Sequence, residues 1–392
     1  MRQAYIVIGA NYGDEGKGLA ASSLAKNAEG PVLNVLINGG PQRGHTVDLP
    51  DGRRHVFKHF GSGAMYGADS FADEDFFVNP IFFNKEREML MTEFGLDPKL
   101  LVSGKCRVTT PWDMMLGQII EENRGAARHG SCGMGIQETR LRFKNTDWAM
   151  HYSEIINCSL EEMRRYHERI LKEYVPGRLE AVGAVMADEW IDVLNDPGIA
   201  DAFWSDIQKM RGHTEICNSW AAAAEGYSTL VFEAGQGLAL DKYNLENFPH
   251  LTPSRTTSFI SAERIRTLSR KTDTEIVYVT RSYFTRHGAG PFPTECRKEE
   301  INPDIVDLTN VPNPHQQSIR YGRFSVNEIM KRIEKDRSDT NTILPVKTAV
   351  FVTHLNETGG EICGDTDMAR LVENFDKAYC SSKNTEMQEY TK

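Results

Sequence analysis

The sequence predicts an α/β protein with a mostly parallel central sheet flanked by helices, a P-loop-like phosphate-binding first turn and a helical insertion. Three observations lead to this prediction. Short apolar segments alternate along the chain with longer segments of helical periodicity, as a parallel sheet requires. A glycine-rich turn joins the first apolar segment to the first helix. Residues 159–226 are rich in helical patterns and lack strand patterns, which predicts the insertion.

The expected elements follow from these patterns in chain order. Strands are expected at residues 4–9, 32–37, 56–60, 102–108, 229–233, 275–280 and 348–353. Helices are expected at residues 80–94, 110–127 and 159–174. In the last of these, Ser159 is the expected N-cap and Glu162 completes a capping box. Open α/β sheets bind ligands at the carboxyl ends of their strands, so the functional residues are expected in the turns found there.

Composition narrows the class of protein. A hydrophobic content of 40% over 392 residues is ample for a core, and no apolar stretch is long enough to span a membrane. The net charge of −10 argues against binding to a nucleic-acid polymer, although single nucleotides need only a few local cations. The seven cysteines include no C-x-x-C pair, so neither a zinc site nor a disulfide framework is indicated. The expected location is the cytoplasm, or the host cytoplasm if the protein is viral.

The first turn, at residues 9–18, has the composition of a phosphate-binding loop. Its glycines allow backbone N–H groups to face phosphate oxygens, and Lys17 adds a full positive charge. It is not a Walker A loop, because Asn11 replaces the first glycine and Gly18 replaces the Mg²⁺-binding hydroxyl. Asp14 is therefore free to act at the phosphates. The alternative is a tight glycine turn with a solvated aspartate and lysine.

A second turn, at residues 38–46, follows the expected strand 32–37 and ends in His45. Together the two turns resemble the adenylosuccinate synthetases, whose first loop reads QWGDEGKGK and whose second reads GG-x-NAGHT. The resemblance continues in the family's order with FEAGQGLALD at residues 232–241, FPHLTPSRTT at residues 248–257 and YFTRHGAGPFPTE at residues 283–295. It implies a single domain over residues 1–392, with a helical insertion at about 159–226.

The resemblance also implies a reaction. An enzyme of this family joins L-aspartate to C6 of a 6-oxopurine nucleoside monophosphate through a 6-phosphoryl intermediate. Asp14 would remove the N1 proton, so that the 6-oxygen attacks the γ-phosphoryl group of a nucleoside triphosphate. His45 and Lys17 would stabilise the developing charge, Gln236 would act beside them, and Mg²⁺ would be held near Asp14 and the Gly44 carbonyl.

Further site residues are implied by the same matches. Gln42, Gln236 and Thr252 would hold the purine monophosphate. Residues 130–135 resemble the family's GTTGRG phosphate loop, so Gly130, Ser131 and Cys132 join this group, with Cys132 where the family has a threonine. An arginine of the partner subunit, Arg140 or Arg142, would reach the 5′-phosphate, which implies a homodimer. The expected nucleotide-binding residues are Asn11, Gly13, Glu15, Gly16, Lys17, Gly18, Gly44, Thr46, Asn356 and Ser382.

Two departures from the family pattern bear on specificity. The family's aspartate-binding loop TTGRRRR appears here as RYGRFS, which retains Arg323 alone of the consecutive arginines, in register with the motif. Arg323 can still bind a carboxylate bidentately. The family's guanine-reading TKLD appears here as THLN, with Asn356 in place of the aspartate. An amide can face an adenine edge, so ATP is the expected phosphoryl donor.

These departures favour a particular branch of the family. The sequence is most similar to the viral-type synthases that join L-aspartate to dGMP and give N6-succino-2-amino-2′-deoxyadenylate, a diaminopurine DNA precursor. Many members of that branch have a small residue where this chain keeps Asp14. Adenylosuccinate formation from IMP therefore stays as the alternative. A catalytically inactive nucleotide-sensing homologue is a more remote one.

Overall fold

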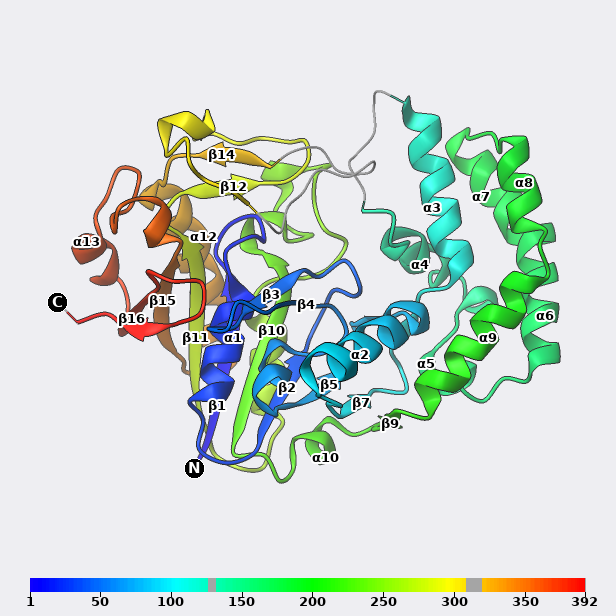
Figure 1. Cartoon of the computed structure of the whole chain (residues 1–392), viewed down its shortest axis with the longest axis horizontal. Helices are drawn as coiled ribbons and strands as arrows, with labels where there is room; N and C mark the ends of the chain where they lie inside the picture. Colours follow the sequence, from blue (N-terminus) through cyan, green and yellow to red (C-terminus); the bar gives the residue numbers. More distant parts are fainter. Residues whose placement is uncertain (126–131, 308–318, 392) are drawn as a thin grey trace.

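The computed structural model describes residues 1–125, 132–307 and 319–391 (Figure 1). A ten-stranded sheet runs through the described residues, and all its neighbouring strands are parallel except β16 and β17. The predicted fold class, a mostly parallel sheet flanked by helices, is confirmed. The strand order is β17 (Gln388–Glu389), β16 (Lys377–Cys380), β15 (Lys347–Thr353), β11 (Thr272–Arg281), β1 (Arg2–Gly9), β10 (Thr229–Gly237), β2 (Val32–Leu36), β5 (Asp69–Ala72), β7 (Leu100–Val102) and β9 (Thr214–Ile216).

The central strands are mostly apolar because both faces of the sheet are covered. Residues facing one side, such as Val7, pack against Leu24 of α1 (Lys17–Lys26). Residues facing the other side, such as Ile6 and Ile8, belong to the core that includes Ile333 of α12 (Val326–Asn341). The remaining helices of the sheet body are α10 (Trp220–Ala224), α11 (Phe259–Arg266) and α13 (Met368–Val372).

Five of the predicted strands are present in the sheet as β1, β2, β10, β11 and β15. The strand predicted at 56–60 is not part of the central sheet. The strand found there, β4 (Arg54–Phe57), pairs only with β3 (His45–Asp48), in a separate antiparallel hairpin. The prediction of one strand at 102–108 is also wrong. A tight turn, in which Cys106 N–H donates to the Ser103 carbonyl at 2.9 Å, divides it into β7 and β8 (Arg107–Val108), and β8 pairs with β6 (Phe77–Val78).

A second body of helices lies beside the edge strands β5, β7 and β9 (Figure 1). It has its own core, which includes Trp112 and Phe203. The predicted capping box is confirmed, since Ser159 N–H donates to Glu162 at 2.8 Å and Glu162 N–H donates to Ser159 Oγ at 3.2 Å. Its helices are α2 (Pro80–Phe94), α3 (Pro111–Arg124), α4 (Ile136–Arg142), α5 (Tyr152–Ile155), α6 (Leu160–Arg169), the π-helical η4 (Ile170–Tyr174), α7 (Val175–Val182), α8 (Asp188–Leu194) and α9 (Gly198–Arg211).

The expectation that residues 159–226 lack strands is wrong, because β9 lies among these helices and extends the central sheet beside β7. The helical body also begins before residue 159, with α2 to α5. A three-stranded antiparallel sheet of β12 (Phe284–Arg286), β14 (Arg320–Gly322) and β13 (Glu295–Cys296) stands at the carboxyl ends of the central strands (Figure 1). Among the described helices, none has both the length and the apolar composition that membrane crossing requires.

Candidate active site

The first glycine-rich loop, between β1 and α1, is closed by its own glutamate. Gly13 and Gly16 adopt left-handed conformations with φ of 115° and 95°. The Glu15 carboxylate accepts from the N–H groups of Asn11 at 3.0 Å and Gly13 at 2.7 Å. Lys17 Nζ donates to the Gly13 carbonyl at 2.7 Å and to Glu15 at 3.2 Å. The Glu15 side chain therefore shapes the loop, and the expected contact of Glu15 with a nucleotide stays a prediction.

Asn11 also supports the loop, and its expected contact with a nucleotide stays a prediction. Its side-chain amide donates to Thr280 Oγ1 at 3.1 Å and accepts from Arg332 Nη2 at 2.6 Å. Both partners belong to other elements, because Thr280 is on β11 and Arg332 is on α12. The buried Asn11 side chain thus ties the loop to the protein. The sequence could not show this, since its partners are distant along the chain.

Asp14 faces a cavity at the end of the first loop. Its side chain is 24% exposed, and Oδ2 lies 3.6 Å from His287 Nε2. Its backbone carbonyl accepts from Arg281 Nε at 2.5 Å, which fixes the main chain at this residue. Burial raises the pKa of the Asp14 carboxyl, although His287 and Arg281 oppose the shift. A carboxylate with a raised pKa is a better proton acceptor, as a general base requires.

His45 stands at the start of β3, with its ring buried. Its Nδ1 lies 2.5 Å from Glu233 Oε1, whereas Nε2 has no hydrogen-bond partner among the described residues. Burial, together with the neighbouring Arg43, lowers the pKa of His45 to about 4, although Glu233 acts in the opposite direction. The imidazole is therefore neutral near pH 7 in the ligand-free site. An incoming phosphate would raise its pKa, because negative charge favours the imidazolium form.

Glu233, on β10, was not among the predicted site residues. Its carboxylate accepts from His45 Nδ1, from the Ser62 N–H at 3.0 Å and from Ser62 Oγ. Burial alone would raise its pKa, but His45 and Arg43 together hold the pKa at about 2. An ionised carboxylate can only accept, so the neutral His45 ring carries its proton on Nδ1. The motif FEAGQGLALD contained the signal for this residue, namely a glutamate within an apolar strand.

Gln236 follows Glu233 on the same strand and reaches the first loop. A Cβ atom at Gly13 would lie only 2.5 Å from Gln236 Oε1, so the two residues meet closely. Next to it, a Cβ at Gly237 would lie 2.3 Å from the Asn11 carbonyl, which restricts this position to glycine. In the neighbouring turn, Asn38 Oδ1 accepts from the Gly235 N–H at 2.6 Å. The first, second and third motifs are thus brought together at the ends of β1, β2 and β10.

One cavity lies over the first loop. Its walls combine the amino-terminal end of α1 with the second turn and with the loop after β15. Cationic and glycine-rich groups line one part, and polar side chains beyond Thr353 line the other. We call this the loop cavity. Residues that line it include Gly13, Asp14, Gly16, Lys17, Gly18 and Gly44 at one end, His45, Thr46 and Arg281 beside them, and His354, Glu357 and Asn384 at the other end.

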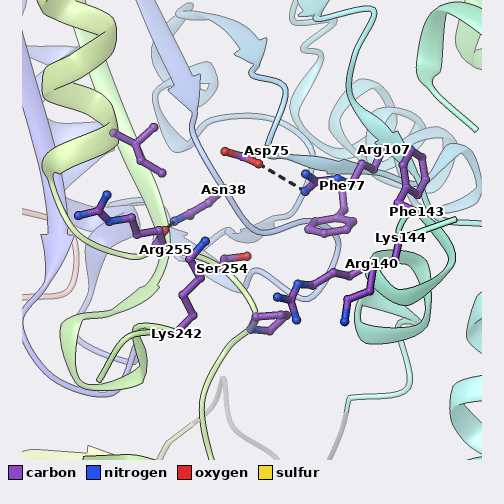
Figure 2. A pocket seen from close by; sticks show the side chains of 12 residues that line it. Asn38, Asp75, Phe77, Arg107, Arg140, Phe143, Lys144, Lys242, Ser254 and Arg255 are labelled. Carbon is purple, nitrogen blue, oxygen red and sulfur yellow. Dashed lines mark hydrogen bonds and ion pairs between the residues drawn. The ribbon is translucent and has the colours of Figure 1, made fainter. Parts of the chain in front are cut away.

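A second cavity, of about 300 Å³, lies between the sheet body and the helical body (Figure 2). Cationic residues line it from both sides: Lys242 and Arg255 in the segment after β10, and Arg140 and Lys144 in α4 and just beyond its end. The Arg255 guanidinium is turned away from the middle of the cavity and lies over the Phe259 ring at 4.1 Å. Arg107 also lines it and lies 3.4 Å from Asp75. We call this the basic cavity. It is within the size range of small-ligand sites, and its excess of cations suits an anionic ligand.

The two arginines expected to reach a partner subunit differ in their surroundings. Arg142 is buried: its guanidinium bonds to both Asp113 oxygens at 2.8 Å and donates to the carbonyls of Trp148 at 2.6 Å and Val108 at 2.7 Å. The candidate role of Arg142 in binding a phosphate is therefore wrong, because every side of the guanidinium is used inside its own protomer. Arg140 lines the basic cavity of its own protomer.

The other residues expected to bind substrate are spread around these cavities. Gln42 Oε1 is buried and has no hydrogen-bond partner in the described part of the chain, as a ligand-facing amide would be. Thr252 is half-buried, and its N–H donates to the Leu240 carbonyl at 2.9 Å. Cys132 is half-buried. Gly130 and Ser131 lie outside the described residues.

The residues expected to determine specificity are exposed. The Arg323 side chain is 53% exposed and lies 3.6 Å from Glu300 Oε2. Asn356 and Ser382 are also exposed. Asn356 does not line the loop cavity, whereas the adjacent Glu357 does and accepts from the Tyr283 hydroxyl at 2.5 Å.

Comparison with known proteins identifies the family to which the chain belongs. A family model described as adenylosuccinate synthetase matches residues 6–371. The chain belongs to the adenylosuccinate synthetase family. Curated adenylosuccinate synthetases similar to it include that of Lactobacillus acidophilus, 29% identical over 299 residues, and that of Prochlorococcus marinus subsp. pastoris, 30% identical over 310 residues. These alignments cover 76% and 77% of this chain but only 66% of each relative, just under two thirds of its length.

Two solved structures share the fold. One is fully ligated adenylosuccinate synthetase from Plasmodium falciparum, with a TM-score of 0.68 and 18% identity over 90% of this chain and 77% of that one. The other is the succinoaminodeoxyadenylate synthetase of cyanophage S-2L bound to dGMP and dATP, with a TM-score of 0.66 and 14% identity. That alignment covers 100% of this chain and 96% of the cyanophage chain. At these identities, the likeness concerns the fold.

Proposed function

We propose that this family member joins L-aspartate to C6 of dGMP, with ATP as phosphoryl donor, and releases N6-succino-2-amino-2′-deoxyadenylate, ADP and phosphate. The observation that carries the proposal is that Asp14 and His45 line one cavity, while Gln236 Oε1 lies close to Gly13, the residue before Asp14. Asp14, His45 and Gln236 come from three separate segments of the chain. The N–H of Gly235, next to Gln236, donates to Asn38 Oδ1, and Asn38 lines the basic cavity.

The chemistry assigned to these residues proceeds in two steps. Asp14 takes the proton from purine N1, and the 6-oxygen attacks the γ-phosphoryl group while ADP leaves. Lys17 and the amino-terminal end of α1 stabilise the phosphates, and His45 donates from Nε2 once it is protonated beside the anion. The aspartate amine then adds at C6 and releases inorganic phosphate, and its surplus protons pass to the surrounding solvent. Phosphorylation is needed because oxide is a very poor leaving group.

The residues of the loop cavity fit a magnesium ion that is bound mainly by phosphate. The described residues contain no group of three or more histidine, cysteine, aspartate or glutamate side chains placed to hold a metal. Mg²⁺ typically uses only one or two carboxylates together with substrate phosphates and water. The Asp14 carboxylate and the Gly44 carbonyl are hard oxygen donors of that kind, and both residues line the loop cavity. The ion would neutralise charge on the transferring phosphoryl group.

The basic cavity is the proposed site of the purine monophosphate. Lys242 lines it from one side and Arg140 and Lys144 from the other, which suits a dianionic 5′-phosphate (Figure 2). Arg323 is proposed to bind L-aspartate, since its guanidinium is exposed and the residue directly follows β14. A homodimer is proposed from the family resemblance.

Two observations favour dGMP over IMP. In structural superposition this chain matches 96% of the cyanophage synthetase but 77% of the Plasmodium falciparum adenylosuccinate synthetase, although the TM-scores are similar at 0.66 and 0.68. The cyanophage protein is described with dGMP bound and with dATP as an energy donor. Retention of Asp14 is the observation that keeps IMP as the second candidate. A deoxyadenine nucleotide is accordingly a candidate donor beside ATP.

A substrate matrix tests the proposal. Purified protein is given L-aspartate, Mg²⁺ and each combination of IMP, GMP or dGMP with ATP, dATP or GTP, and the succino-nucleotide is quantified by mass spectrometry. The expected result is the highest kcat/KM with dGMP and an adenine nucleotide. A higher kcat/KM with IMP would make the chain an adenylosuccinate synthetase. No phosphate release with any combination would instead support an inactive nucleotide-sensing protein.

A further inference from the structure

Arg43 is unusual for its position in the second turn. The family motif GG-x-NAGHT has alanine two residues before the histidine, and this chain has Arg43 there. The side chain is not a solvated surface group, because the residue is 1% exposed. Its guanidinium lies over the Phe76 ring at 5.8 Å, and a Cβ at Gly39 would lie 3.1 Å from its Cγ. The turn therefore contains a buried cation where the motif has a methyl group.

The guanidinium makes its contact with His45 at Nδ1, whereas Nε2 is the other ring nitrogen. Arg43 Nη2 lies 2.8 Å from His45 Nδ1 and 3.3 Å from Glu233 Oε1. Since Nδ1 also lies 2.5 Å from the same Oε1, the three atoms form a closed triangle. The Nδ1 proton goes to the carboxylate, so Nη2 donates mainly to Glu233 and packs against the ring nitrogen.

Arg43 depends on Glu233 for its burial. Its Nε and Nη1 have no hydrogen-bond partner among the described residues, so the carboxylate is its main compensation. Both side chains are fully buried, and a buried charge whose partner is removed is strongly destabilising. Glu233 is itself held by Ser62, which donates to it from both N–H and Oγ. The ion pair of Arg43 and Glu233 is therefore held in place, and the His45 imidazole packs against it.

We propose that Arg43 is a positioning residue that, together with Glu233, fixes the ring of His45 so that Nε2 is presented to the reacting phosphoryl group. A single bond between Nδ1 and Glu233 would let the ring pivot about that bond. The Arg43 guanidinium, with Nη2 2.8 Å from Nδ1, is not a second hydrogen-bond partner of the protonated Nδ1, but it fills the space into which the ring would pivot. Nε2 is the ring nitrogen left without a partner in the described structure. The inference rests on the proposed function, in which His45 acts on the γ-phosphoryl group.

Two matched substitutions separate positioning from packing. Arg43→Met and Arg43→Lys both keep an unbranched apolar stem over Phe76, but only lysine retains a charged donor. We expect Arg43→Met to lower kcat by roughly 10- to 100-fold, the loss typical of a displaced catalytic group. The KM values for the purine monophosphate, the nucleoside triphosphate and L-aspartate should stay within about twofold, because none of these ligands touches Arg43 in the proposed site. Arg43→Lys should recover a substantial part of kcat.

A role in packing alone predicts a different ranking of the two variants by kcat. If Arg43 only fills space, Arg43→Met should match the wild type or exceed Arg43→Lys in kcat, because methionine buries no charge. Either that order or equal changes in all three KM values would overturn the proposal. Thermal unfolding of both variants identifies any loss of kcat that comes from unfolding.

A second measurement does not need turnover. In ¹⁵N-histidine-labelled protein without ligands, a short Nδ1–H bond to a carboxylate gives a strongly low-field proton signal, which a His45→Gln variant assigns. The Arg43→Met variant should shift and broaden that signal, whereas Arg43→Lys should keep it sharp. An unchanged signal in Arg43→Met would overturn the positioning role even if the wild type made no succino-nucleotide. Failure of the proposed function is therefore distinguishable from failure of this inference.

Discussion

At the scale of single residues, a substitution of Asp14 gives the most direct test of the proposed chemistry. We expect Asp14→Asn to lower turnover by several powers of ten while nucleotide binding stays measurable, because the proton acceptor and an oxygen donor to Mg²⁺ are lost together. The measurement is steady-state product formation together with equilibrium binding of the purine monophosphate. An amide variant that kept more than about a tenth of the activity would rule out the assignment.

Arg323 is predicted to bind the carboxylate of L-aspartate. Its guanidinium is half-exposed and only loosely paired with Glu300, at 3.6 Å, so it can turn towards a ligand. We expect Arg323→Leu to raise the KM for L-aspartate far more than the KM for the purine monophosphate. Glu300→Gln serves as the matched control, since it removes the partner but keeps the guanidinium. Equal effects of Arg323→Leu on both KM values would give Arg323 a structural role.

Asn356 is predicted to favour ATP over GTP. Restoring the carboxylate with Asn356→Asp should shift the preference towards GTP by about 1.5–3 kcal/mol, the range of a hydrogen bond to a charged group. The ratio of kcat/KM for the two nucleotides measures the shift. In this structure Glu357, not Asn356, lines the loop cavity. A preference that changed with Glu357→Gln but not with Asn356→Asp would assign base recognition to Glu357.

At the scale of elements, Arg142 connects α4 to α3 and β8. It bonds to Asp113 on α3 and to the Val108 carbonyl on β8. Because both charges are buried, Arg142→Met should lower the free energy of unfolding by about 3–5 kcal/mol through the unpaired Asp113 carboxylate. Denaturant unfolding measures this loss, and the double variant Arg142→Met with Asp113→Asn should recover part of it. A loss below about 1 kcal/mol would contradict this account.

The strands show which elements can be predicted from the sequence pattern. Strands β1, β2, β10, β11 and β15 were predictable because each is a short apolar run that is covered on both faces. β9 was not predictable, since its residues Thr214–Ile216 are half-exposed or exposed and it is a strand only because it pairs with β7. Strand pairing at a distance is a property of tertiary structure, and the local pattern carries only a weak trace of it.

At the scale of the whole molecule, the location of Arg140 makes a prediction about the proposed dimer. Arg140 lines the basic cavity of its own protomer, so it should act there and not in the partner. Mixing the inactive variants Asp14→Asn and Arg140→Leu should then give no recovery of activity. If Arg140 acted in the partner's site, randomly mixed dimers would recover about a quarter of the wild-type activity, because one of two sites in each hybrid would be complete. Subunit exchange is verified first by tagging one variant.

The sequence by itself determined the fold class, the family and the loops that contain the proposed catalytic residues. It could do so because glycine-rich turns, apolar strands and motif order are local properties of the chain. Only the tertiary structure decided which side chains in those loops face a cavity. It turned Asn11 and Glu15 inward, paired Arg142 with Asp113, and placed Glu233 and Arg43 around His45. Burial and hydrogen bonding depend on residues distant in sequence, and these contacts determine whether a polar side chain supports the fold or meets a ligand.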